Sequence, residues 1–280
     1  MIYKPLFLAI LSLFLFLSFV SCGTSPDLES TDTKAVPPSP SAKNIMLFSG
    51  QYNILSDLNL VGTEDFSLFL LPSGNIQVKS EAIMDKGYIY QHSAEFIADN
   101  QWNIDHIIIN YHGGGLTRTQ FIDRDGDTYS CLLSTGDGRT QHFGFAGATG
   151  GQAGADKYDI SYNLLAFSIP IFSKLNLRRG DYRDVRTILI EPSSLKAFDA
   201  KFRYNRLEDA MVTVPAGKFY ASKYCVSDCL GEHKRFCWVD INNLIICLGD
   251  NLEGNNIYQL SSLIRGSDAK INVSFNRDNL

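Results

Sequence analysis

The sequence predicts a mainly β fold made of antiparallel strands. Apolar and polar residues alternate along short segments such as Ile76–Lys79, as expected of a strand with one buried and one solvent-facing side. Clusters of Gly, Pro, Asn and Asp separate these segments at short intervals. Closely spaced turns connect antiparallel neighbours, so many short strands in succession indicate a barrel or a sandwich.

In the N-terminal half, each pair of predicted strands surrounds a turn. Residues 72–75 join the first pair, residues 99–101 the second and residues 125–126 the third, and all three turns are rich in Asp, Asn, Gly or Pro. The strands of this half are predicted at residues 66–71, 76–79, 88–97, 105–111, 116–122 and 128–133.

In the C-terminal half, the strand pattern resumes after a long interruption. Pro215 and Gly217 turn one strand into the next, because Pro fixes φ and Gly tolerates positive φ. Asn242-Asn243 predicts a tight turn. The strands of this half are predicted at residues 187–190, 200–204, 211–214, 219–226, 235–240 and 244–248.

Two stretches interrupt the pattern. Residues 144–156 are rich in Gly and predict a mobile loop. Residues 159–177 are apolar almost throughout, and Pro170 prevents one continuous helix. We expect a short helix near residues 162–167, followed by an extended piece. In a β protein, such an apolar segment must be covered by the sheet or lie on its concave side.

The N-terminus predicts export and a lipid anchor. The apolar run Leu6–Val20 is shorter than the about 20 residues that a transmembrane helix needs, and it has the length of a signal-peptide core. Ser21-Cys22 resembles the cleavage box of bacterial lipoproteins, although Phe19 stands where Leu is usual. The resemblance implies a diacylglycerol on the sulfur of Cys22. The alternatives are ordinary secretion with cleavage near Cys22 and an uncleaved anchor.

These features predict three segments. Residues 1–21 are the signal peptide, and residues 22–43 are the lipidated Cys and a disordered tether rich in Ser, Thr, Pro and Asp. Residues 44–280 form a single β-rich domain, because no second linker or repeat follows. Gly23, rather than Asp, follows Cys22; in the lipoproteins that the chain resembles, this points to the outer membrane, on its periplasmic or surface face.

Charge argues against a nucleic-acid partner. The formal net charge is −5, and acidic residues interrupt the one basic cluster, at residues 178–186. Nucleic-acid binding needs a clustered basic face. The sequence predicts no transmembrane segment after the signal peptide, so membrane contact is expected through the lipid on Cys22.

The remaining cysteines allow two interpretations. An exported chain meets oxidising conditions, and a hairpin that turns at Gly231 would place Cys225 opposite Cys237, so we predict a Cys225–Cys237 disulfide. Cys229, nearer the tip, is a rival partner. The alternative is a zinc site of these three cysteines and His233, which recur every four residues. Gly231 in mid-segment and strand-like flanks argue against the helix that this site needs.

Two other motifs have simpler explanations. His112-Gly113-Gly114-Gly115 resembles the oxyanion loop of esterases, but the sequence has no G-x-S-x-G motif to supply a nucleophile, so a Gly-rich turn is the simpler account. Asp123–Asp127 resembles the start of a calcium loop, but Gly and Glu are missing at the places that an EF-hand needs, and a β-turn explains the residues. We therefore predict no enzyme activity, cofactor or metal.

Several short stretches together resemble a bacterial family that carries the name glycolipid-binding and has no characterised function. They keep their order between residues 60 and 262: DNQW (99–102), DISYN (159–163), IPI (169–171), YNRL (204–207), VPAGKF (214–219), WVD (238–240) and LI (244–245). The resemblance implies an incomplete antiparallel β-barrel, or β-roll, similar to outer-membrane lipoprotein carriers, with one or two short helices on its concave face. The cysteine-bearing hairpin and the Gly-rich loop depart from the family.

We therefore expect a membrane-anchored, exported, non-catalytic module that binds a lipid or another apolar small molecule. The alternative is a surface structural or interaction lipoprotein without a ligand cavity, in which the same apolar residues fill the core. The candidate ligand-binding residues are Trp102, Leu165, Phe167, Ile169, Ile171 and Trp238.

Overall fold

The computed structural model describes residues 43–85, 89–146, 158–228, 234–249 and 258–266. The described residues form one 15-stranded sheet with a 3-10 helix and one short α-helix. The strands of its first half are β1 (Ile45–Ser56), β2 (Asn59–Leu70), β3 (Ile76–Asp85), β4 (Ile89–Ala98), β5 (Ile104–Gly113), β6 (Leu116–Asp125), β7 (Thr128–Thr135) and β8 (Thr140–Ala146).

The second half begins with β9 (Asp159–Ser161), and the 3-10 helix η1 (Leu165–Phe167) and helix α1 (Ser168–Leu175) follow it. The remaining strands are β10 (Tyr182–Ile190), β11 (Ala197–Val214), β12 (Gly217–Asp228), β13 (Lys234–Asp240), β14 (Ile245–Gly249) and β15 (Tyr258–Arg265).

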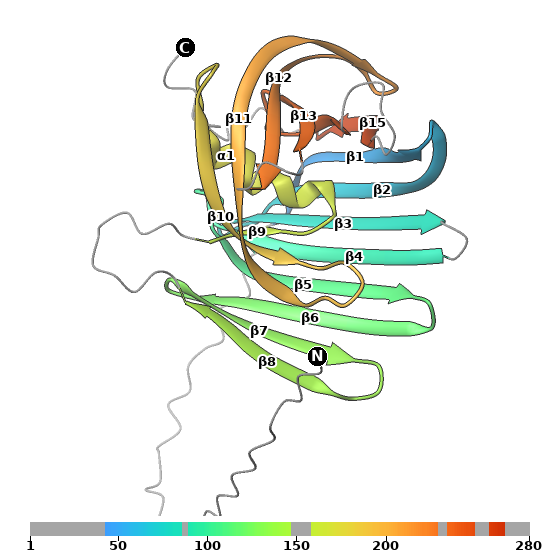
Figure 1. The fold of residues 1–280 in the computed structure, drawn as a ribbon, viewed down its shortest axis with the longest axis vertical. Coiled ribbons are helices and arrows are strands. Elements are labelled where there is room, and N and C mark those ends of the chain that lie inside the picture. The colour runs from blue at the N-terminus through green and yellow to red at the C-terminus, as the bar shows by residue number, and fades with distance from the viewer. Residues whose placement is uncertain (1–42, 86–88, 147–157, 229–233, 250–257, 267–280) are drawn as a thin grey trace, which may run out of the picture. The chain divides into compact units, whose positions relative to one another are not determined.

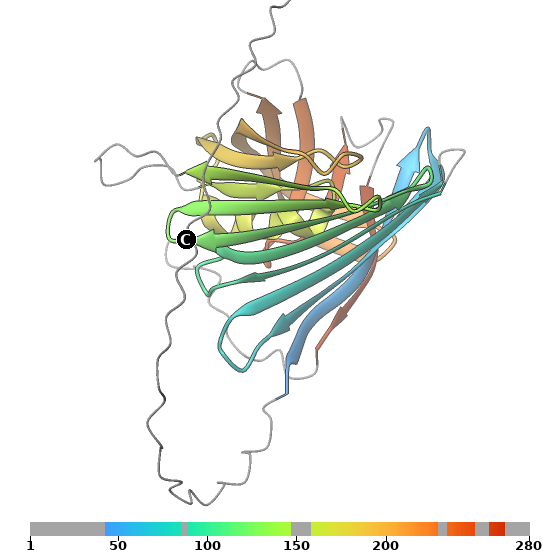
Figure 2. The ribbon, with the colours of Figure 1, turned by 90° about the horizontal axis from the view of Figure 1, so that it is seen from below.

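The sheet runs from β8 through β1 to β15 and then back to β9, so β1 and β15 join its two halves. Neighbouring strands are antiparallel, except that β9 lies parallel to β10. The sheet is open, with β8 and β9 at its edges, and it curves around η1 and α1 (Figures 1 and 2). The predicted fold class, a mainly β, antiparallel, incomplete barrel with short helices on the concave face, is confirmed.

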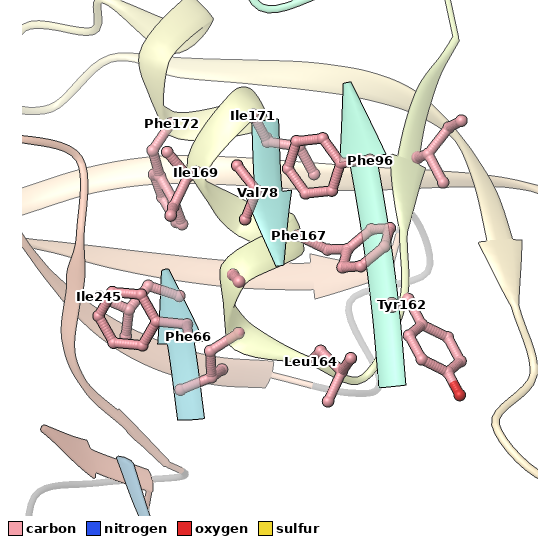
Figure 3. Close-up of a cluster of buried hydrophobic side chains, with 14 of the residues drawn as sticks. Phe66, Val78, Phe96, Tyr162, Leu164, Phe167, Ile169, Ile171, Phe172 and Ile245 are labelled. Carbon is pink, nitrogen blue, oxygen red and sulfur yellow. The ribbon is translucent and has the colours of Figure 1, made fainter. Parts of the chain in front are cut away.

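The helical segment joins the two halves through its aromatic side chains. The ring of Phe167 lies 4.9 Å from that of Phe96 on β4, between centroids, and Phe172 contacts Tyr204 and Tyr224 on β11 and β12. Figure 3 shows the side chains of this segment among those of the sheet. The helices therefore form the centre of the core rather than a surface cover.

The position of the helix differs from the prediction. We expected a helix near residues 162–167 and an extended piece after it, whereas α1 covers Ser168–Leu175. Pro170 lies in the first turn of α1, where backbone N–H groups have no intrahelical acceptor, so proline is tolerated there. Asn176, with φ 34°, ends the helix in the left-handed conformation.

Candidate functional site

A cavity of about 380 Å³ lies between the helical segment and the inner face of β10–β15. Its size falls within the roughly 300–1,000 Å³ of small-molecule sites. Most of its wall is apolar or aromatic, and the side chains that form this part are Tyr162, Leu165, Phe172, Leu189, Ile190, Phe202, Tyr204, Val226, Cys237, Ile245, Leu248 and Tyr258.

Strand register brings side chains of β12 and β13 to the face of the cavity. Tyr224 pairs with Cys237, and Val226 pairs with Arg235, so these four side chains lie on the same side of the sheet. The ring of Phe172 packs against those of Tyr204 and Tyr224, at centroid distances of 5.8 and 5.1 Å. The helix thus forms one wall of the cavity and the pleated strands form the other.

Polar side chains lie at one edge of the cavity. Asp228 ends β12, Arg235 lies at the start of β13, and Pro192 belongs to the β10–β11 turn; all three line the cavity at this edge. The uncharged polar residues Ser161, Asn163 and Ser168 line it from the side of the helical segment. Arg235 is exposed. An apolar interior with a charged edge suits a ligand that has an apolar chain and a polar end.

Burial keeps the titratable groups in the interior of the cavity wall, and the histidine behind it, uncharged. The Tyr162 hydroxyl lies 2.6 Å from Nδ1 of His92, and burial lowers the pKa of this histidine to about 4. Burial also raises the pKa of the Tyr162 and Tyr204 hydroxyls and of the Cys237 thiol above their usual values. At neutral pH these groups are neutral, and the Cys237 thiol is a poor nucleophile.

Glu64 attaches the helical segment to the first half of the sheet. This residue lies on β2 and is fully buried, and its carboxylate accepts hydrogen bonds from Ser80 Oγ (2.7 Å) and from the backbone N–H groups of Leu165 (2.9 Å) and Ala166 (3.2 Å). Desolvation raises the pKa of Glu64 to about 7, although the three donors act in the opposite direction. Glu64 was not among the residues predicted from the sequence.

Of the six candidate ligand-binding residues, Leu165 lines the cavity. Phe167, Ile169 and Ile171 are buried elsewhere around the helical segment. Trp102 lies in the β4–β5 turn, is buried with φ 64°, and does not line this cavity.

Trp238 projects from the opposite face of the sheet. It follows Cys237 along β13 and pairs with Lys223 and Cys247, so its side chain lies on the other side from the cavity. The ammonium of Lys223 lies 5.3 Å from the centre of its ring. Tyr204 and Val226 do line the cavity. Alternation along the strands was the sequence signal that could have placed Trp238 on the other face.

The predicted Cys225–Cys237 disulfide is not formed. Both thiols are free and buried, as are those of Cys131 and Cys247. Cys225 pairs with Phe236, one residue away from the predicted register, so its side chain points to the face opposite Cys237. The alternative zinc site needs Cys229 and His233, which lie outside the described residues.

Thiol titration checks this correction. We expect a Cys229→Ser variant, isolated as the processed protein and denatured, to show four reactive thiols, from Cys131, Cys225, Cys237 and Cys247, with or without prior reduction. Cys22 is not counted, because the lipid predicted on its sulfur would leave no free thiol. Two reactive thiols before reduction and four after it would show that a disulfide is present and would contradict the observed register.

Both remaining motifs form turns. Gly114 and Gly115 have φ of 59° and 76° and connect β5 to β6, and Gly126, with φ 61°, connects β6 to β7. Most of the predicted loop at residues 144–156 lies outside the described residues, and its first residues belong to β8. In the described part of the chain, no group of three or more His, Cys, Asp or Glu side chains is placed to hold a metal ion. No helix in that part is long and apolar enough to cross a bilayer.

Comparisons with known proteins show partial similarity of fold. No family model and no curated protein matches the chain. A β-barrel-like protein of the DUF1849 family from Brucella abortus aligns with 80% of this chain and 100% of its own, at 7% identity and a TM-score of 0.48. A DUF1089 family protein from Pseudomonas aeruginosa aligns with 61% of this chain and 82% of its own, at 19% identity and a TM-score of 0.42.

A third structure, described as a candidate lipoprotein from Parabacteroides distasonis, aligns with 80% of this chain and 97% of its own. Its identity is 10% and its TM-score is 0.27. At these identities and TM-scores, the similarities assign neither a family nor a function to this chain.

Proposed function

We propose that this chain is an exported lipoprotein, anchored through Cys22, that binds an apolar chain in the cavity between α1 and β10–β15 and does not transform it chemically. One observation carries this proposal. The cavity is walled by aliphatic and aromatic side chains, while Asp228 and Arg235 lie at one edge. An acyl chain with a polar end matches that distribution.

The expected binding energy is sufficient for a ligand of this kind. Burial of a methylene contributes about 0.8 kcal/mol, so about ten methylenes would contribute about 8 kcal/mol before the losses of association. A preformed wall limits those losses. Contacts of Phe172 with Tyr204 and Tyr224 hold the helix against the strands without a ligand.

The state of the titratable groups supports a non-catalytic role. Burial favours the neutral forms of His92, Tyr162 and Cys237 at physiological pH. General acid–base catalysis works best with a pKa near the working pH, and nucleophilic catalysis by Cys works through the thiolate. These groups have neither property. They suit the lining and support of an apolar site.

Filling the cavity tests the proposal. Val226 lines the cavity and is partly exposed, so a Val226→Trp variant can place the indole in the ligand space. We expect its affinity for a fluorescent C16 fatty acid to fall by at least about tenfold, which corresponds to about 1.4 kcal/mol. Thr213→Trp, at an exposed position on β11, is the matched control and is expected to bind as the wild type does.

Titration of the fluorescent fatty acid and native mass spectrometry of the purified full chain provide the measurements. Thermal unfolding verifies that both variants fold. Wild-type protein that takes up no fatty acid and carries no co-purified lipid would contradict the proposal. Equal affinity of Val226→Trp and the wild type would place the ligand outside this cavity.

A further inference from the structure

Exposed aliphatic side chains lie at one end of the strands, in or next to the connections between them. Leu58 and Leu60 belong to the β1–β2 hairpin and are 74% and 61% exposed. Ile89, which begins β4, is 66% exposed, and Leu116, which begins β6, is 49% exposed. The C-terminal ends of β1, β3 and β5 lie on the same side of the sheet (Figure 1). We call these four side chains the apolar rim.

Leu58 occupies a backbone conformation that does not favour leucine. Ser56 pairs with Asn59, so Asp57 and Leu58 form a two-residue turn, and their φ values are 50° and 66°. Gly or Asn is the usual residue in such a turn, and a left-handed conformation costs other residues roughly 1–2 kcal/mol. Because the Leu58 side chain is mostly exposed, burial within the chain does not offset this cost. A contact outside the chain would explain the residue.

The apolar rim and the polar edge of the cavity lie at the same end of the strands. Tyr258 lines the cavity and pairs with Ile54, two residues before the end of β1. Across the concave side, the guanidinium of Arg118 on β6 donates to the carbonyl of Ser193 in the β10–β11 turn. Pro192, which precedes Ser193 in the sequence, lines the cavity. A surface that covers the rim would therefore adjoin the polar edge of the cavity.

We propose that the apolar rim docks on the surface of a phospholipid bilayer, with the polar edge of the cavity facing the headgroups. This inference rests on the proposed function, since the membrane would be the source or the destination of the apolar ligand. Aliphatic side chains on separate turns can enter the interfacial region individually. Exposed Arg235 lies at the edge of the cavity, beside Asp228, and exposed Lys234 precedes it on β13; these two cations complement lipid phosphates. Asp57 on the β1–β2 turn favours zwitterionic over strongly anionic lipid.

The length of the tether permits this orientation. β1 has 12 residues, about 40 Å at the rise of a strand, and runs from the end of the tether to the rim. Residues 23–43 can span at most about 70 Å when fully extended. An anchor at Cys22 therefore reaches the membrane on which the rim docks. The anchor also raises the effective concentration of the rim, so weak docking is sufficient.

Quenching of tryptophan fluorescence by lipid tests the proposal. The lipidated full chain is reconstituted in phosphatidylcholine–phosphatidylethanolamine vesicles with brominated acyl chains. Leu60→Trp and Ile89→Trp place a reporter on two different hairpins of the rim. Ser73→Trp, at an exposed position in the β2–β3 turn at the opposite end of the strands, is the control. Trp102 and Trp238 are buried and common to all three variants.

We expect quenching of the two rim reporters to exceed that of the Ser73→Trp reporter by at least about twofold. Equal quenching of the rim and control reporters, in variants that unfold at the wild-type temperature, would overturn the proposal. The result does not depend on ligand binding. Val226→Trp in the otherwise wild-type chain tests only the binding of fatty acid in the cavity. Loss of the proposed ligand site and loss of the proposed membrane docking would therefore show in different measurements.

Discussion

Replacement of Phe167 by Ala is expected to lower the free energy of unfolding by about 4 kcal/mol, in the range measured for buried Phe→Ala substitutions. The side chain is 1% exposed. Its ring lies 4.9 Å from that of Phe96 and 5.7 Å from that of Tyr162, between centroids. Truncation therefore removes the contact between the helical segment and β4 and leaves a cavity that rigid strands cannot fill.

Urea unfolding, followed by far-ultraviolet circular dichroism, measures this loss. Phe198→Ala is the matched control, because the same atoms are removed from a side chain that is 49% exposed on β11. We expect the control to change the free energy of unfolding by about 0.5 kcal/mol or less. A loss below about 1 kcal/mol for Phe167→Ala would mean that the helical segment is not packed in the core as described.

Local patterns predicted the fold class because alternation and turn residues are local properties. The turns at Gly74, Gly114 and Gly126 were found in this way, since each has a positive φ that favours glycine. β1 and β15 were missed, although their pairing joins the two halves of the sheet. Pairing between residues about 210 positions apart leaves no local signal.

The predicted disulfide failed because of a single step of register. A hairpin centred on Gly231 pairs Cys225 with Cys237, whereas the structure pairs Tyr224 with Cys237. Because successive side chains alternate between the faces of a sheet, this step sends the two thiols to opposite sides. The same alternation places Trp238 away from the cavity. Cys225 was a candidate for the disulfide, and Trp238 for the cavity, because of their residue types. Only the strand register excludes them from these roles.

The helix was misplaced because Pro170 was treated as an interruption. Proline breaks a helix in its interior but fits its first turn. Pro170 therefore fits a helix that begins at Ser168 better than it fits an extended segment after a helix that ends at Phe167. Glu64 had a signal that could have been used. Glu64 lies two and four residues before Phe66 and Leu68, which are buried. Alternate residues of a strand share one face, so extending the predicted strand back to Glu64 would have placed its carboxylate on the buried face.

Glu64 is expected to make the stability of the protein depend on pH. Burial raises the pKa of this carboxyl in the folded protein to about 7 from its usual 4.5. Between these values, the folded state holds a proton that the unfolded state has released. The contribution of Glu64 to stability is therefore fully present below about pH 4.5 and is lost as the pH rises through 7, by about 3 kcal/mol in all.

Glu64→Gln isolates this effect. The amide oxygen of Gln can accept from Ser80 Oγ and from the N–H group of Ala166, which both bond Oε1 of the carboxylate, and Gln does not titrate. The N–H group of Leu165 bonds Oε2 and loses its acceptor in the variant at every pH. We expect the stability of the variant, relative to that of the wild type, to increase by up to about 3 kcal/mol between pH 4.5 and pH 8. Urea unfolding at the two pH values measures the difference between variant and wild type, in which all other titrating groups cancel.

The matched control is Glu81→Gln, which neutralises an exposed carboxylate on the neighbouring strand β3. It is expected to leave the difference between the two pH values unchanged. A Glu64→Gln variant whose stability follows the wild type at both pH values would show that Glu64 is already ionised, or already neutral, throughout this range. The opposite sign, with the relative stability of the variant falling between pH 4.5 and pH 8, would mean that the three donors outweigh the cost of burial. The charged form would then hold the helical segment over the cavity.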